Sequence, residues 1–344
     1  MSPVTMTILL SSIAAGTILT MSSYHWLLAW IGLEINTLAI IPIISKQHHP
    51  RATEATTKYF LTQAAASALI LFSSTINAWQ TGTWDITQMT NPTPTTLLTA
   101  ALAMKLGLAP THFWLPEVLQ GTTMNTALII TTWQKLAPMS LIYLTMNNLP
   151  PTILLLTGML SSLLGGWGGL NQTQTRKLMA YSSIAHLGWM AVISTMMPNI
   201  LILTLTTYIL MTTAMFLTLI STKSKTIQDA STSWTTSPTI TTMSLLILLS
   251  LGGSPPLKGF IPKWLILEEL ITQNLVPTAT IMAMSALLSL FFYLRLTYTT
   301  TLTMAPNTTP TKYKWRFKIS APKLLTMTTP MALLLLPMTP LLTS

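Results

Sequence analysis

Eleven apolar segments, separated by short polar stretches, constrain this chain of 344 residues more than any other feature. Only 7% of the residues are charged, whereas a soluble domain carries roughly 25%. Most segments are close to the roughly 20 apolar residues that cross a bilayer as a helix. The chain is therefore predicted to be an all-α polytopic membrane protein with about eleven transmembrane helices. The predicted segments are residues 3–21, 25–45, 58–79, 95–120, 123–146, 150–170, 177–197, 199–221, 238–272, 275–298 and 323–342.

The basic residues between these segments fall only in every second loop. When the loops are numbered from one to ten, the odd loops contain neither lysine nor arginine. This positive-inside pattern supports eleven spans and predicts that the N-terminus lies on the positive side and the C-terminus on the other. Together with Arg295 at the end of its segment, the residues that form the pattern are Lys46, Arg51, Lys58, Arg176, Lys177, Lys223, Lys225, Lys312, Lys314, Arg316, Lys318 and Lys323.

Composition excludes several classes of function. The formal net charge is +10, but the basic residues do not gather on one face or run, so nucleic-acid binding is not expected. The chain has no cysteine, which excludes disulfides, thiolate metal sites and cysteine nucleophiles. No Ser/His/Asp set, metal-ligand cluster or phosphate-binding loop is evident, so neither covalent catalysis nor a metal or cofactor site is expected here.

Two segments are too long for a single straight crossing. Segment 95–120 has 26 residues, and segment 238–272 has 35, which would extend about 52 Å as a helix against a hydrocarbon core of roughly 30 Å. Each contains glycine and proline, which break helices. A break at membrane depth is tolerated where it is buried in protein or lines a polar cavity. Both segments are therefore predicted to be discontinuous helices.

The two breaks also match each other at a constant separation of 146 residues. The two segments are five spans apart, so their copies would run in opposite directions through the membrane. Inverted repeats of this kind are common in transporters. The matched pairs are Gly107 with Gly253, Pro110 with Pro256, and Pro116 with Pro262.

Lysines lie near the middle of two apolar segments, and each is followed by a proline. These are Lys105 with Pro110, and Lys135 with Pro138. A charge inside a membrane is expensive, so both lysines are predicted to be functional. Glu34 and Lys105 each lie about ten residues into segments that enter from the same face, and are expected at similar depth. A carboxylate beside an ammonium favours both charged forms, so moving the carboxylate away would release the lysine's proton.

Three further groups extend this set of titratable sites. Lys263 follows the second break, His112 follows the first, and His186 lies in segment seven. Joined by water, these groups could form a line of proton sites at mid-membrane. A structural role remains an alternative for each: a hydrogen-bonded core histidine, a lysine in an already hydrated break, or a glutamate bonded to a neighbouring helix. The role of Lys258, close to the second break, is equally open.

Four stretches closely resemble the subunit 2 family of mitochondrial NADH:ubiquinone oxidoreductase, respiratory complex I, in its vertebrate form. The resemblance covers essentially the whole chain in order. It departs at Ser254, where many relatives have an apolar residue, and at Lys258, where threonine or serine is common, which leaves the hydration of this break open. The stretches are MKLGLAPTHFWLPEVLQG, WQKLAP, GGWGGLNQTQTRKLMAYSSIAHLGWM and LLSLGGSPPLKGFIPKWLILEEL.

The resemblance implies an antiporter-like membrane-arm subunit with two inverted five-helix repeats, at about 1–148 and 149–298, and a polar loop and last helix at 299–344. In the family scheme Glu34 and Lys105 match the glutamate–lysine pair and Lys135 the linking lysine. Lys263 matches the basic residue on the second broken helix, and His186 a polar site near the central axis.

The resemblance also implies what surrounds the chain. NADH, FMN, the iron–sulfur clusters and ubiquinone are expected in other subunits, and the partners are other membrane-arm and accessory subunits and membrane lipids. The chain itself would be a redox-free part of a proton-translocating enzyme of the mitochondrial inner membrane, with its N-terminus in the matrix and its C-terminus in the intermembrane space. Two alternatives are a free-standing cation/proton antiporter and a structural spacer that does not pump.

Overall fold

The computed structural model describes residues 2–235, 237–301, 306, 323–334 and 336–340, and these are almost entirely helical. Each of the eleven predicted segments contains at least one helix. Extended pairing in the described residues is confined to two isolated bridges, His25 with Asp85 and Gln174 with Thr226. The chain divides into two compact units, unit 1 (Met1–Ser161 and Ser194–Met196) and unit 2 (Ser162–Ile193 and Met197–Ser344), with the boundary inside α8 (Pro151–Gly169).

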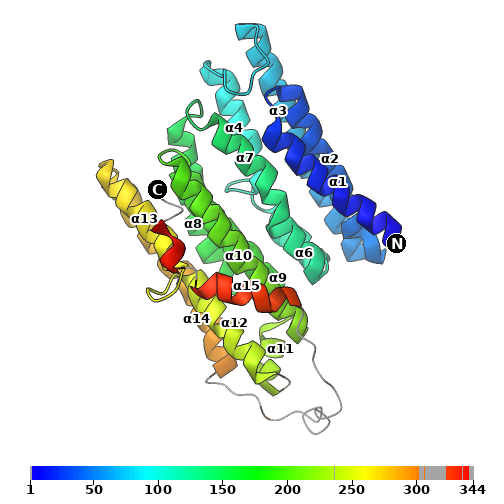
Figure 1. Cartoon of the computed structure of the whole chain (residues 1–344), viewed down its shortest axis with the longest axis vertical. Helices are drawn as coiled ribbons and strands as arrows, with labels where there is room; N and C mark the ends of the chain where they lie inside the picture. The colour runs from blue at the N-terminus through cyan, green and yellow to red at the C-terminus, as the bar shows by residue number, and fades with distance from the viewer. Residues whose placement is uncertain (1, 236, 302–305, 307–322, 335, 341–344) are drawn as a thin grey trace. The chain divides into compact units, whose positions relative to one another are not determined.

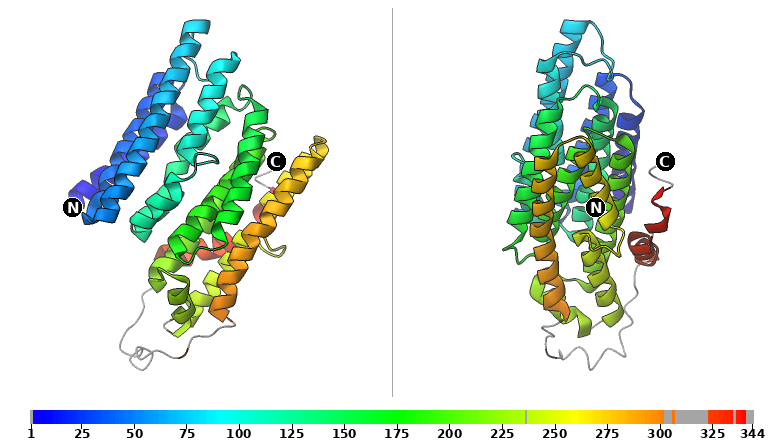
Figure 2. Two further views of the ribbon diagram at one scale, coloured as in Figure 1. Left: turned by 180° about the vertical axis from the view of Figure 1, so that it is seen from behind. Right: turned by 90° about the vertical axis from the view of Figure 1, so that its left-hand side faces the viewer.

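In unit 1, α1, α2 and α3 pack side by side, and α4 and α5 pack on α3 (Figure 2). Helix α3 begins eight residues before the predicted segment 58–79. Pro50 at its first position suits a helix start, and the His49 ring accepts a hydrogen bond from the Arg51 N–H at 3.2 Å. The helices of unit 1 are α1 (Pro3–Ser22), α2 (Trp26–Ile44), α3 (Pro50–Thr81), α4 (Pro92–Leu106), α5 (Trp114–Gly121), α6 (Met124–Thr131) and α7 (Leu136–Thr145).

Both predicted breaks are present, and they have the same local geometry. Helix α4 ends at Leu106, and Gly107 follows with a left-handed φ of 76°. In unit 2, α12 (Pro238–Gly252) is followed by Gly253 with φ of 84°. The N–H of each glycine, and that of the residue after it, donates back into the last turn of its helix. This is the Schellman arrangement that ends helices at a glycine.

Replacing Gly107 by alanine should destabilise unit 1 by about 1–2 kcal/mol, because a β-carbon disfavours the left-handed conformation. An added Cβ would also approach Leu115 and Trp114 to 3.3 Å. We expect a lower thermal midpoint for the purified assembly that contains Gly107→Ala. An unchanged midpoint would mean that the turn relaxes to another conformation.

Segment 123–146 is interrupted as well, which the sequence did not predict. Between α6 and α7 lies η2, a single 3₁₀ turn at Trp133–Lys135. Pro138 contributes to this interruption, because it has no N–H to donate to the carbonyl four residues earlier, which lies within η2. Lys135 therefore lies at a junction between two short helices.

In unit 2, α10 packs on α9, α12 and α13, and α14 packs on α12 and α13. Figure 1 shows α15 lying across α10 and α12, with which it makes contact. Helix α15 has 12 residues, about 18 Å, and is too short for a core of roughly 30 Å. The predicted eleventh span is thus not confirmed. The helices wholly in unit 2 are α9 (Thr175–Ile193), α10 (Pro198–Thr222), α11 (Ile227–Thr232), α12, α13 (Phe260–Thr272), α14 (Val276–Thr301) and α15 (Lys323–Leu334).

Six helices of the described part of the chain, α1, α2, α3, α8, α10 and α14, are long and apolar enough to cross a membrane. The remaining predicted spans are made of shorter or more polar helices, in part because breaks divide them. The predicted polar loop 299–322 lies almost wholly outside the described residues, as do Lys312, Lys314, Arg316 and Lys318.

Candidate functional site

Glu34 lies on α2 and is held by two hydroxyl groups. Its carboxylate accepts hydrogen bonds from Ser67 of α3 at 2.5 Å and from Thr37, one turn later on α2, at 3.1 Å. The bond to Ser67 is the interhelical contact expected of a structural glutamate. Neither hydroxyl neutralises the carboxylate, so Glu34 is still available to interact with a cation.

That cation is Lys105 of α4. It is 4% exposed, and its ammonium has no hydrogen-bond partner among the described residues. The Glu34 carboxylate is close enough for a Coulombic interaction with Lys105, but no ion pair joins them among the residues described. Lys105 is not at the middle of a helix, as the sequence suggested, but in the last turn of α4, because Gly107 ends the helix two residues later. The two groups are thus neighbours without a direct bond.

Lys135, in η2, reaches the end of the same half-helix. Its ammonium donates to the carbonyl oxygen of Leu106 at 2.5 Å, and it lies 5.3 Å from the centre of the Trp114 ring. The side chain is 1% exposed. A cation over an indole face is stabilised by the ring quadrupole. The Lys135 ammonium therefore has a hydrogen-bond acceptor and an aromatic neighbour, whereas the Lys105 ammonium has no hydrogen-bond acceptor among the described residues.

The residue before Lys135 ties η2 to α2. The Gln134 amide donates to the Asn36 side-chain oxygen at 2.8 Å, and Asn36 is two residues after Glu34. Neither Gln134 nor Asn36 was predicted as a site residue from the sequence. The only available signal was that Gln134 is a polar residue beside the lysine in WQKLAP. Unit 1 thus brings Glu34, Lys105 and Lys135 into one connected group.

Unit 2 holds the second group, formed by Lys263 on α13 and His186 on α9. The half-buried Lys263 ammonium donates to the Gly252 carbonyl oxygen at 2.9 Å, across the second break. His186 interacts electrostatically with Lys263, and its ring centre is 5.7 Å from that of Tyr208 on α10. Five of the sequence-predicted site residues therefore form one group in each unit, Glu34, Lys105 and Lys135 in unit 1 and His186 and Lys263 in unit 2.

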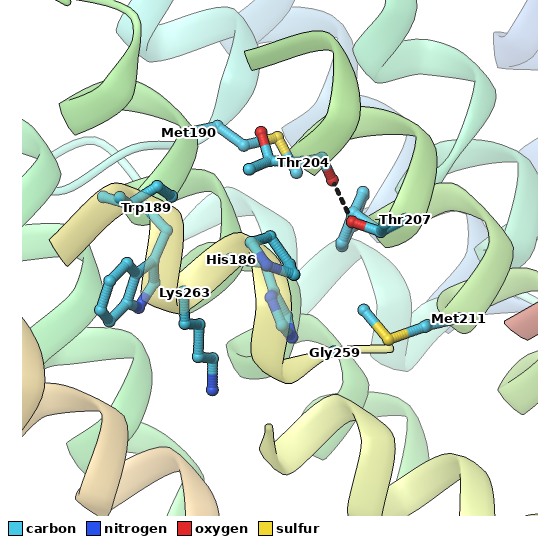
Figure 3. Close-up of a pocket in the computed structure, with 11 residues that line it drawn as sticks. His186, Trp189, Met190, Thr204, Thr207, Met211, Gly259 and Lys263 are labelled. Atoms are coloured by element: carbon cyan, nitrogen blue, oxygen red, sulfur yellow. Dashed lines mark hydrogen bonds between the residues drawn. The ribbon is translucent and has the colours of Figure 1, made fainter. Parts of the chain in front are cut away.

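A cavity of about 20 Å³ is lined by His186, Lys263, Tyr208 and Gly259 among others. Figure 3 shows His186 and Lys263 lining it together, with Thr204 and Thr207 of α10 nearby. A single water needs about 10–15 Å³ and two to four polar partners. The cavity is therefore large enough for one water, and a histidine and a lysine are among the residues that line it.

His112 and Lys258 lie in the two breaks, and both are buried, at 5% and 2% exposure. His112 Nδ1 has no hydrogen-bond partner among the described residues, and its ring centre lies 4.3 Å from that of Phe113, with the two rings tilted by 32°. Neither residue contacts the groups described above through any hydrogen bond or ion pair in the described part of the chain.

Other charged residues have structural partners. Lys58 of α3 forms ion pairs with Glu54 at 2.5 Å and with Glu117 of α5 at 2.7 Å, and all three side chains are exposed. The guanidinium of Arg295 donates to the carbonyls of Leu170 and Gln172, after the end of α8. These charges therefore have partners that are exposed side chains or backbone carbonyls, whereas Lys105 and Lys135 are buried.

Comparison with known proteins places the chain in a family. Residues 23–289 match the family model described as NADH:quinone oxidoreductase/Mrp antiporter, and residues 290–343 match that of the NADH dehydrogenase subunit 2 C-terminus. NADH-ubiquinone oxidoreductase chain 2 of Oncorhynchus mykiss is 58% identical over 100% of this chain and 99% of its own length. The chain belongs to this family. Its apolar helices and family membership together make it a membrane protein and a subunit of NADH-ubiquinone oxidoreductase.

Two solved structures share the fold of this family member. A chain of respiratory complex I from Thermus thermophilus, with bound aureothin, superimposes with a TM-score of 0.81 at 28% identity, over 96% of this chain and 78% of the other. A chain of the Mrp complex from Dietzia sp. DQ12-45-1b gives 0.80 at 17% identity, over 87% of this chain and 61% of the other. At 17% identity only the fold is shared.

Proposed function

We propose that this chain translocates protons from the matrix to the intermembrane space as a membrane-arm subunit of NADH:ubiquinone oxidoreductase in the mitochondrial inner membrane. Neighbouring membrane-arm and accessory subunits and lipids would surround it, and other subunits would hold NADH, FMN, the iron–sulfur clusters and ubiquinone. The N-terminus would face the matrix and the C-terminus the intermembrane space, as the loop charges indicate. The single observation that carries the proposal is the buried Lys105 ammonium, which has no hydrogen-bond partner in the part of the chain that the structure describes.

The chemistry of unit 1 begins at Glu34 and Lys105. A buried ammonium without a partner is retained only where function requires it. The nearby carboxylate favours the protonated lysine, and a weaker interaction between them lets the proton leave. Lys135, bonded to the end of the same half-helix, is the next base. His186 and Lys263 of unit 2, with one water between them, would continue the transfer, and His112 is a further candidate base in the first break.

The proposal includes two inverted repeats, each containing one discontinuous helix. The matching turns at Gly107 and Gly253 support this arrangement, as does the separation of 146 residues between them. Inverted repeats place the broken helices near the membrane midplane, with polar groups at the breaks. Redox energy would reach these sites through neighbouring subunits as a change in charge pairing.

A free-standing cation/proton antiporter is the second candidate, favoured by the fold shared with the Mrp complex chain. A first test is purification in mild detergent, followed by a stain for NADH oxidation in a native gel and mass spectrometry of the band. Migration within a large NADH-oxidising assembly supports the proposal. Migration alone or as a small oligomer contradicts it and favours the antiporter, which cation/proton exchange in liposomes would then measure.

Replacing Glu34 by glutamine should slow proton translocation in the assembled complex by roughly tenfold, because losing one charge interaction shifts a proton equilibrium by about that factor. The measurement is the number of protons pumped per electron in liposomes. Glu117→Gln is the matched control, since it neutralises an exposed carboxylate of the same unit and should leave pumping unchanged. Equal effects of both substitutions would contradict a role for the Glu34 charge.

A further inference from the structure

In each unit, the backbone turn that ends the half-helix before the break uses only two of its last four carbonyls. In unit 1 the N–H groups of Gly107 and Leu108 donate to Ala103 and Met104, and in unit 2 those of Gly253 and Ser254 donate to Leu249 and Ser250. Of the two carbonyls that these bonds leave, one belongs to the residue just before the left-handed glycine. These residues are Leu106 and Gly252, which are separated by the same 146 positions as the glycines.

A lysine ammonium donates to this carbonyl in both units. Lys135 reaches the Leu106 oxygen at 2.5 Å, and Lys263 reaches the Gly252 oxygen at 2.9 Å. The two lysines come from different elements, because Lys135 lies in η2 and Lys263 on α13. They are not separated by 146 residues; Glu117 occupies the position that would match Lys263. The carbonyl that accepts the bond therefore has the same position in both units, whereas the lysine that donates to it comes from a different position in each.

A hydrogen bond from an ammonium to the C-terminal end of a helix is strongly stabilising. The C-terminal end of a helix carries about half a negative charge, and a cation there is stabilising. The bond is charge-assisted, and such hydrogen bonds are about twice as strong as neutral ones. Lys135 is almost fully buried, so bulk water cannot readily replace its ammonium. Lys105 differs, since it is equally buried but donates no hydrogen bond.

We propose that Lys135 and Lys263 have a positioning role in addition to carrying a proton: the ammonium of each caps the broken half-helix of its unit and so fixes the conformation of the break. When the ammonium gives its proton to the next base, the neutral amine can still donate a hydrogen bond, but it no longer has a charge opposite the helix end. The cap weakens and the break loosens. This proton-linked step rests on the proposed function, whereas the cap itself does not.

The test is hydrogen–deuterium exchange of the assembled complex, read by mass spectrometry on peptides that contain residues 103–108 and 249–254. Lys135→Met should accelerate exchange of the Gly107 and Leu108 amides roughly tenfold to a hundredfold, the factor that corresponds to a hydrogen bond to a charged group. It should leave 249–254 unchanged. Lys263→Met should give the converse result.

Two comparisons separate the cap from a general effect of lost charge. Lys105→Met removes an equally buried charge that makes no hydrogen bond, so exchange at 103–108 should not accelerate. Lys135→Arg keeps charge and donor, so it should restore protection at the break while proton translocation stays impaired, because arginine does not release its proton. Should Lys135→Met fail to assemble, Lys135→Gln, which keeps a donor without the charge, replaces it with the same expectation.

Unchanged exchange at the breaks in Lys135→Met and Lys263→Met would overturn the cap. Equal acceleration of exchange at 103–108 by Lys105→Met would also overturn it. Pumping is measured separately on the same samples. Faster exchange with normal pumping would support the cap and contradict the proposed function. Slower pumping with unchanged exchange would support the proposed function and contradict the cap.

Discussion

Lys105→Met is expected to slow proton transfer through this subunit by roughly 10²–10⁴-fold, the usual contribution of a positioned acid or base. Methionine keeps an apolar side chain of similar length but cannot carry a proton. Assembly should be normal, because the lost ammonium makes no hydrogen bond and Glu34 keeps its bonds to Ser67 and Thr37. The measurement is protons pumped per electron in liposomes, with a native gel to confirm assembly.

Lys58→Met is the matched control for this prediction. It removes a lysine of the same unit that is exposed and pairs with Glu54 and Glu117. Exposed ion pairs contribute little to stability, so both pumping and assembly should stay close to normal. Normal pumping by a correctly assembled Lys105→Met complex would instead support the structural spacer.

Gly259→Ala is expected to have the largest effect on folding, with a loss of more than about 3 kcal/mol. Gly259 closes the second break against α12, and an added Cβ would lie 1.7 Å from the Ser250 carbonyl oxygen. Backbone atoms cannot yield as a flexible side chain can, so the break has to shift. Because Gly259 also lines the cavity beside His186 and Lys263, the shift disturbs that site. Little or no assembled complex should appear on a native gel.

Gly252→Ala is the comparison for this second prediction. A Cβ at position 252 would meet only Tyr293 and Leu290, at 3.8 and 3.9 Å, and the residue is helical, where alanine is favoured over glycine. Assembly and thermal midpoint should be unchanged or slightly higher. If both substitutions are tolerated equally, the close approach at Gly259 does not limit the fold.

The fold was largely predictable because apolar length and glycine–proline breaks are local properties. Both discontinuous helices are present where Gly107 and Gly253 predicted them. The start of α3 was missed because residues 50–57 are polar, although Pro50 and His49 suit a helix start. The eleventh span, at 323–342, stays a prediction, because composition sets hydrophobicity but not direction and the described helix there, α15, has 12 residues.

The site was predictable in its residue types and less so in its contacts. Burial of Lys105 and Lys135 follows from their apolar surroundings in the sequence. The bond from Lys135 to Leu106, and that from Lys263 to Gly252, join elements whose approach depends on tertiary packing. Ser67, which donates to Glu34, is one of many serines and threonines in apolar helices, so nothing in the sequence sets it apart.

The three-residue turn η2 is bonded to both helices that carry the proposed proton pair. Gln134 holds α2 through Asn36, and Lys135 holds the end of α4 through Leu106. If the charge state of Lys135 changes the distance between Glu34 and Lys105, then a change in that distance must also change the proton affinity of Lys135. Thermodynamic reciprocity requires the two effects to have the same factor. Proton uptake at one lysine and release at the other are then two expressions of a single coupling free energy.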